Sequence, residues 1–476
     1  MKSVLLGNGI NIQFGGKAYS NYFIMERIRY RAKLDSYVQL FGNTLTSSEI
    51  INILDGFVDI ANGVRNGDYD QYIDGDENIQ EAIDDFKCRY TSNVSASYDI
   101  MLEDWFLLIQ MFFLKNNDLT DNKSAAIQGF ERLILDAIYN GGKIQDLFKG
   151  MPKKVKHFFK GYDNIFTLNY DNNLEALTRK TVFHLHGDFS VLANSENPNN
   201  VQGYIRSQEN KLVVVKGMEH CFCNALLNYS GMLKYKTATD FHSLITISEN
   251  FKSLYDSDLD FRKQLSGLEK NKPFDYQMIM TKIEHPELNM ATEYYFDKFA
   301  TISDELHIIG MSPNNDAHIF DLIRNNKALK KVVFYYFSNK EKNYIEKHFS
   351  KELFSFESVD GLWKSLGSNK PKYNCNYSMP TDIDRFISCF NALSGSVSTK
   401  EDILKEISQI PKFEMERLCK LVRADMQKRN PEHSPTDEEG FFKSTASISY
   451  IALQEGLLPS TLYMICIMNF HIIRDN

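Results

Sequence analysis

The stretch SVLLGNGIN, residues 3–11, joins an apolar run (residues 3–6) to the turn Gly7-Asn8-Gly9. An apolar run that ends in a glycine turn predicts a buried β-strand followed by a tight connection. Short runs rich in β-branched and aromatic residues recur later, with helical patterning between them, over residues 164–169, 181–186, 211–215, 305–310 and 331–337. Strands that alternate with helices predict an open parallel sheet covered by helices, an α/β, Rossmann-like fold.

A long helical segment separates the first strand from the others. Apolar residues recur at helical spacing over residues 49–64, 79–90, 98–114 and 125–139. We therefore expect the sheet to begin at residue 3, to be interrupted by a helical insertion over about residues 20–160, and to resume near Asp163.

The last part of the chain has a different composition. Residues 366–380 are polar and include Pro371 and Pro380, which is typical of a linker. Only helical patterns follow them. The predicted organisation is an α/β domain over residues 1–365, a linker over 366–380, and an all-α domain over 381–476 with a regulatory or assembly role.

Composition and charge narrow the class of protein. Of the 476 residues, 43% are hydrophobic and 24% are charged, which excludes a disordered or fibrous chain. The net charge of −8 disfavours a surface coated with nucleic acid. No secretory signal is present and no apolar run reaches about 18 residues, so we expect a cytoplasmic protein that does not bind a membrane.

Cysteine usage points to a reducing compartment. The seven cysteines are odd in number and scattered, as in a reduced intracellular protein. Cys221 and Cys223 form a close pair beside His220, but no second pair stands at zinc-ribbon spacing. We therefore expect no metal.

Polar residues follow each of three later predicted strands. Asn169 and Asp171 follow the second strand, where an amide can orient a water or a ribose hydroxyl and a carboxylate can also simply cap the next helix. His186 ends the third strand, before Gly187, and a histidine there can act as a general base near neutral pH. Strand alternation puts His184 and His186 on one face, so the alternatives are a metal pair, for which no further His/Cys ligands stand nearby at suitable spacing, and a buried structural histidine.

The fourth polar segment follows the run over residues 305–310. It includes Gly310, Ser312 and Asp316 and opens a predicted helix. Ser312 and free N–H groups at a helix start can hold a phosphate or a ribose, and the alternative is that Asp316 simply caps the helix. Because strand ends of a doubly wound sheet converge on one crevice, we expect all these segments to meet there.

In this order the motifs resemble those of the sirtuin-like NAD-binding fold, in the divergent prokaryotic branch found in antiphage defence proteins. The matching positions are Gly7-Asn8-Gly9 with Asn11, then Asn169-Tyr170-Asp171, then His186-Gly187-Asp188, and finally Gly310, Ser312, Asn315, Asp316, His318 and Ile319. The resemblance covers about residues 1–365.

The resemblance implies an NAD hydrolase that yields nicotinamide and ADP-ribose and depletes NAD in abortive infection. It assigns catalysis to Asn169 and His186. It assigns contacts with NAD to eight of the other motif residues, Gly7, Asn8, Gly9, Asn11, Asp171, Gly310, Ser312 and Asp316.

The chain also departs from deacetylating sirtuins, because their Gly-Ile-Pro-Asp-Phe-Arg loop and their four-cysteine zinc ribbon are missing. This disfavours deacetylation. The resemblance implies a homo-oligomer and a protein partner, such as a HerA-type translocase or a phage trigger. The alternatives are a module that binds NAD or ADP-ribose without cleaving it, and a protein similar to the AbiH abortive-infection group.

Overall fold

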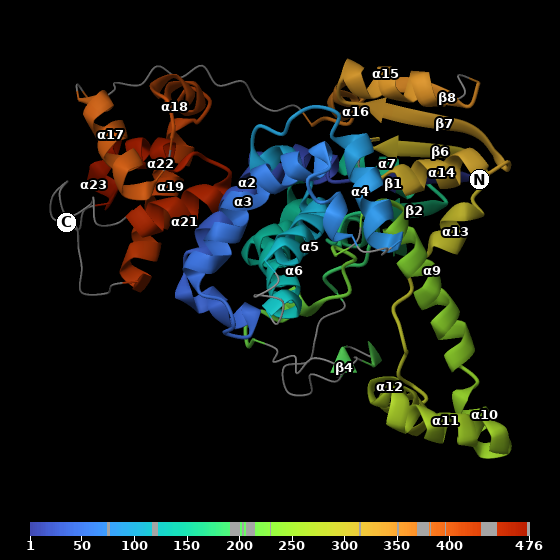
Figure 1. Cartoon of the computed structure of the whole chain (residues 1–476). Helices are drawn as coiled ribbons and strands as arrows, with labels where there is room; N and C mark the ends of the chain where they lie inside the picture. The colour runs from blue at the N-terminus through green and yellow to red at the C-terminus, as the bar shows by residue number, and fades with distance from the viewer. Residues whose placement is uncertain are drawn as a thin grey trace. The chain divides into compact units, whose positions relative to one another are not determined.

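The computed structural model describes residues 1–73, 77–116, 122–190, 200–201, 204–205, 215–228, 230–313, 316–349, 352–368, 380, 382–395, 397–429 and 445–473. Its centre is a six-stranded sheet in which all paired strands are parallel (Figure 1). In spatial order the strands are β3 (Val182–His184), β2 (Asn164–Thr167), β1 (Lys2–Leu6), β6 (Asp304–Ile309), β7 (Leu329–Tyr336) and β8 (Phe354–Ser358). The predicted α/β class with a parallel sheet is confirmed.

The strand order reverses next to β1. From β1 the chain adds β2 and β3 on one side, and β6, β7 and β8 on the other. Leu6 pairs with Thr167 of β2 and with Ile309 of β6, so these three strands end at the same level. In open α/β sheets a ligand crevice forms at such a reversal, beyond the carboxyl ends of the strands.

The first strand is buried on both faces. Val4 and Leu6 pack in the cluster that includes Val155 and Phe159, whereas Leu5 packs with Phe166 and Leu306 in the opposite cluster. A parallel strand covered on both sides needs apolar residues at successive positions, and the run over residues 3–6 supplies them.

The predicted helices of the insertion are present. After the short α1 (Gly9–Gly15) and α2 (Asn21–Ala32) come α3 (Ser47–Asn66), α4 (Glu77–Arg89), α5 (Trp105–Lys115), α6 (Lys123–Tyr139) and α7 (Lys153–Lys160). Thr46 and Glu49 form a capping box that fixes the start of α3, and Gly67 ends it in the left-handed conformation.

The remaining described helices of the sheet-containing unit come after β2 in the chain. They are α8 (Asn173–Thr178), α9 (Gly231–Ser248), α10 (Phe251–Ser257), α11 (Leu259–Asn271), α12 (Pro273–Glu284), α13 (Phe296–Ala300), α14 (Ala317–Asn325), α15 (Asn339–His348) and α16 (Val359–Ser365). A separate two-stranded ladder joins β4 (Asn200–Val201) to β5 (Tyr204–Ile205). Most of the strand predicted over residues 211–215 lies outside the described residues.

The chain forms two compact units, residues 1–14 with 31–368, and residues 15–30 with 369–476. The predicted linker begins close to this division. Residues 15–30, which the sequence analysis assigned to the first domain, belong instead to the second unit. There the buried Arg27 donates to the Leu453 carbonyl oxygen at 2.9 Å, and the Tyr30 hydroxyl donates to that of Ala446 at 3.1 Å.

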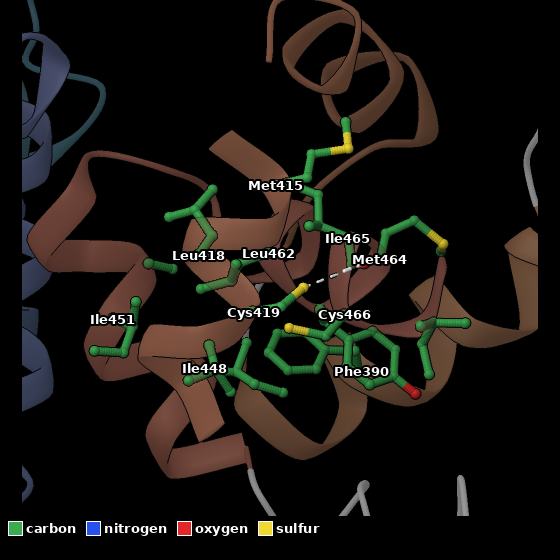
Figure 2. Packing of buried hydrophobic residues seen from close by; sticks show 14 of the residues in the cluster. Phe390, Met415, Leu418, Cys419, Ile448, Ile451, Leu462, Met464, Ile465 and Cys466 are labelled. Atoms are coloured by element: carbon green, nitrogen blue, oxygen red, sulfur yellow. Dashed lines mark hydrogen bonds between the residues drawn. The ribbon is translucent and has the colours of Figure 1, made fainter. Parts of the chain in front are cut away.

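The described C-terminal residues of the second unit form α17 (Ile383–Ser394), α18 (Lys400–Ile407), α19 (Lys412–Arg429), α21 (Thr445–Glu455), α22 (Pro459–Met468) and α23 (Phe470–Ile473). Figure 2 shows their shared core, where Phe390, Ile448 and Cys466 pack together. Among the described residues, no single helix has the length and apolarity to cross a bilayer. Only α21 and α22 taken together, bent by 114°, reach that length and composition.

Candidate functional site

Two glycine turns lie against each other at the point where the strand order reverses. The Gly9 N–H donates to the Gly310 carbonyl oxygen at 2.8 Å, and the Gly7 N–H donates to that of Ile309 at 3.0 Å. A Cβ on Gly9 would come within 2.5 Å of the Gly310 Cα, and Gly310 has a φ of +69°. The glycines therefore have a packing cause, which is the close approach of the two strand ends.

This packing uses backbone N–H groups of the first glycine turn. Besides Gly7 and Gly9, the N–H of Ile10 donates within the turn, to the Gly7 carbonyl oxygen at 3.3 Å. Contacts between this turn and a phosphate therefore fall to side chains. Asn8 is exposed and Ser312 is half-buried, so both side chains are partly open to solvent.

Asn169 follows β2 and is held against the first glycine turn. Its Nδ2 donates to the Gly7 carbonyl oxygen at 3.2 Å, and its N–H donates to the Thr167 hydroxyl at 3.1 Å. The residue is buried, with 8% of its surface exposed. Asn169 thus lies between the ends of β1 and β2, where the sequence placed it.

Asn11 and Asp171 bind each other. Asn11 Nδ2 donates to Asp171 Oδ2 at 2.7 Å, while Asp171 Oδ1 accepts from the Asn173 N–H and side-chain amide at 3.1 and 2.6 Å. Burial raises the pKa of Asp171, and the hydrogen bonds from Asn11 and Asn173 oppose that shift. Asp171 therefore organises the start of α8 and ties it to α1.

His184 and His186 have separate partners, although strand alternation predicted a common face. His184 contacts the Asn169 carbonyl oxygen through Nδ1 and Glu175 through Nε2, at 2.9 and 2.7 Å. The Glu175 carboxylate outweighs the effect of burial and raises the pKa of His184 to about 9. β3 ends at His184, so His186 lies beyond the strand.

A sharp turn after β3 directs His186 toward α14. Gly187 has a φ of +83°, and a Cβ there would lie 2.3 Å from the Asn224 carbonyl oxygen, so only glycine fits. His186 Nε2 then meets His318 Nε2 at 3.3 Å. Asp316 lies beside them, with ligand atoms of all three side chains within 4.8 Å of one another. The Phe296 ring packs near both imidazoles.

Burial dominates the electrostatics of this histidine cluster, which we define as His186, Asp316 and His318. It lowers the pKa of His186 well below the usual value and that of His318 to about 3, with a further lowering from Lys234. It raises the pKa of Asp316 to about 7. Both imidazoles are therefore neutral at pH 7.

Charged side chains from other elements surround this cluster. Lys234 of α9 is 2% exposed, and its ammonium contacts Glu103 at 3.5 Å. Glu103 lies in the segment that leads into α5. The charge of Arg89, at the end of α4, lowers the pKa of Asp316 and so opposes the effect of burial. The helical insertion thus contributes to the surroundings of the strand ends.

The predicted site residues fall into two groups. Gly7, Asn11, Asn169 and Asp171 are joined by the contacts above, and His186 and Asp316 are joined through His318. In the part of the chain that the structure describes, no hydrogen bond links Asn169 to His186. Asn315 lies outside the described residues.

From the sequence, His318 was named only as a position of the resembled motif, and Glu103 and Lys234 were not singled out at all. His318 had a usable signal, since it stands two residues after Asp316 in a segment already singled out. Lys234 and Glu103 had no such signal in the sequence. Neither lies in a recognisable motif, and 131 positions separate them, so nothing indicates that they form a pair.

A second polar cluster surrounds Asp136. Its carboxylate accepts from the Tyr37 hydroxyl at 2.8 Å, contacts His220 Nε2 at 2.6 Å and pairs with Arg31 at 3.0 Å. Tyr139 stacks on His220 with ring centroids 4.0 Å apart, and Cys221 is buried beside them. This arrangement is a buried ion-pair network within the sheet-containing unit.

No protein-family model, no curated protein and no solved structure matches the chain.

Proposed function

We propose that the chain is an NAD glycohydrolase, which cleaves NAD to nicotinamide and ADP-ribose. The observation that carries the proposal is the placement of Asn169 and His186. They follow the carboxyl ends of the adjacent strands β2 and β3, on the same side of the sheet as the ends of β1 and β6, where the strand order reverses. This end of the sheet is where open α/β sheets bind nucleotides. The motif resemblance adds to it.

In the proposed reaction the bond between nicotinamide and ribose C1′ breaks, and nicotinamide leaves with the bonding electrons. Water adds to C1′, and its proton passes to solvent. Asn169 has an amide that can hold a ribose hydroxyl or the attacking water. A neutral His186 can accept a hydrogen bond from a ribose hydroxyl.

The side chains of Asn8 and Ser312 take the diphosphate in this proposal. They stand on the two turns that flank the strand reversal, and both are at least partly exposed. Gly7, Gly9 and Gly310 support them by holding the turns together.

The test is nicotinamide release from NAD by the purified full-length protein, alone and with candidate activators. Asn169→Ala and His186→Ala should each lower turnover about 10²-fold or more. Asn326→Ala is the control for the first, because Asn326 Nδ2 also donates to a backbone carbonyl oxygen, that of Ile302, at 2.8 Å. His307→Gln, at another buried histidine, is the control for the second. Unchanged turnover in either Asn169→Ala or His186→Ala would refute its assigned role.

The second candidate function is a module that binds NAD or ADP-ribose without cleaving it. One observation favours it: His186 is only 3% exposed, and its Nε2 is engaged by His318. Intact NAD retained by the protein after prolonged incubation would select this candidate over the hydrolase.

Unregulated NAD cleavage would kill the host cell, so the hydrolase needs an inactive state. We therefore propose an antiphage role, in which infection releases the activity and NAD is depleted. The second unit is the candidate for sensing or assembly, acting through self-association or through a protein partner such as a HerA-type translocase or a phage component. Loss of phage protection in bacteria that express Asn169→Ala would support this role, and full protection would contradict it.

A further inference from the structure

The histidine cluster has the geometry of a metal site. His186 Nε2 and His318 Nε2 lie 3.3 Å apart. Two nitrogens that each lie about 2.0–2.1 Å from a tetrahedral zinc ion are separated by roughly 3.3 Å. The separation in the protein therefore equals one edge of a zinc coordination tetrahedron.

Asp316 supplies the third ligand. One of its carboxylate oxygens lies within 4.8 Å of a ring nitrogen of each histidine. Each of these two distances needs to shorten by at most about 1.5 Å to reach the same tetrahedral edge of roughly 3.3 Å. Asp316 directly precedes the first turn of α14. Two imidazoles and one carboxylate, with a fourth position open, form a recurrent catalytic zinc set.

The surroundings also suit a bound ion. His186 and His318 are 3% and 1% exposed, and the Phe296 ring forms an apolar wall beside them. His318 Nδ1 is buried and has no hydrogen-bond partner among the described residues, so the second nitrogen of this ring lacks the outer partner that metal-bound histidines usually have. An apolar shell that excludes water strengthens the bonds between ligands and metal.

One neighbour opposes a cation. The Lys234 ammonium is close enough to lower the pKa of each member of the cluster. Glu103 partly neutralises this charge from 3.5 Å. Removal of the Lys234 charge should therefore strengthen metal binding.

The Asp136 cluster is a poorer candidate, although its ligand atoms are equally close. Its carboxylate already has three partners, Arg31, Tyr37 and His220. A metal would have to displace Arg31 from Asp136. The buried Arg31 charge would then lose its partner, which is strongly unfavourable.

We infer that His186, Asp316 and His318 bind one divalent transition metal ion of the zinc class. Such a metal would occupy the His186 lone pair that the proposed hydrolase uses, so it would inhibit NAD cleavage. This second consequence rests on the proposed function, whereas metal binding does not.

The experiment titrates the metal-free full-length protein with Co²⁺ and Zn²⁺, followed by absorption and calorimetry. We expect one equivalent per chain and a Co²⁺ spectrum of low coordination number without thiolate charge-transfer bands. His318→Gln and Asp316→Asn should each weaken binding by about 100-fold or more, since even outer residues around a metal contribute about 10–100-fold. Lys234→Met should tighten it.

His220→Gln, in the Asp136 cluster, is the matched control and should leave binding unchanged. The use of Asp316→Asn beside His318→Gln covers the case in which one variant fails to fold. Absence of binding, unchanged affinity in a folded His318→Gln or Asp316→Asn variant, or loss of binding in His220→Gln would each overturn the inference. Nicotinamide release enters none of these readouts, so failure of the metal site and failure of the hydrolase remain distinguishable.

Discussion

Asn11 and Asp171, 160 residues apart in the chain, are joined by a buried hydrogen bond of 2.7 Å. The bond ties the turn after the first strand to the segment after the second. Asp171 also accepts two hydrogen bonds from Asn173. One carboxylate thus holds together two of the strand ends on which the proposed site depends.

Asp171→Ala should lower the free energy of unfolding by about 3 kcal/mol, because each buried donor left unpaired costs roughly 1–3 kcal/mol. Urea denaturation monitored by circular dichroism measures this. Asp163→Ala is the control, since Asp163 accepts one exposed hydrogen bond from the Lys2 N–H, and it should cost about 1 kcal/mol or less. Equal losses in the two variants would contradict the role given to Asp171.

Gly9→Ala should destabilise the sheet by about 3 kcal/mol or more, because the new Cβ meets backbone atoms of Gly310 that cannot rotate away. Gly267→Ala is the control. Gly267 lies in α11 with no atom near its Cβ position, so the change should stabilise the helix by about 0.5–1 kcal/mol. Thermal unfolding compares the two. A neutral Gly9→Ala variant would show that the strand ends are not in tight contact.

Cysteine reactivity should follow burial. Burial raises the pKa of Cys223 to about 12, so at pH 8 only about one molecule in 10⁴ carries the thiolate. Cys88 is exposed. Iodoacetamide labelling read by peptide mass spectrometry should therefore modify Cys88 at least about 100-fold faster than Cys223. In the unfolded protein the two cysteines should be labelled at similar rates. Similar rates in the native protein as well would contradict the burial of Cys223.

The core of the second unit depends on Phe390 (Figure 2), which is fully buried. Its ring stacks on that of Tyr463 with centroids 4.8 Å apart. Phe390→Ala should destabilise that unit by about 3–5 kcal/mol. Hydrogen exchange should detect faster opening in residues 383–473 than in the sheet. Phe413→Ala, at a side chain that is 66% exposed, should change stability by about 0.5 kcal/mol or less. Similar exchange in the two variants would contradict this core.

Local patterns were sufficient to predict much of the sheet. The apolar run at residues 3–6 became β1, and the runs near residues 164, 181, 305 and 331 became β2, β3, β6 and β7. β8 was missed because its sequence, FSFES, has only two apolar residues and lacks the continuous apolar run that marks the other strands, and it lies at an edge with one neighbour. An edge strand needs less apolar surface than a central one.

Contacts between residues far apart in the sequence could not be predicted from local patterns. Nothing in residues 15–30 indicates that Arg27 donates to a carbonyl oxygen 426 positions away. The contact between His186 and His318 spans 132 positions, and it depends on a turn after β3 that the sequence shows only as a glycine. The strand-end residues could be predicted one at a time, but the two groups they form could not.

The most direct test of the central claim is a crystal structure of the protein with ADP-ribose. We expect the terminal ribose beside Asn169 and His186 and the diphosphate beside Asn8 and Ser312, at the carboxyl ends of β1, β2, β3 and β6. A ligand bound elsewhere on the chain, or a protein that does not bind ADP-ribose or NAD at all, would contradict it.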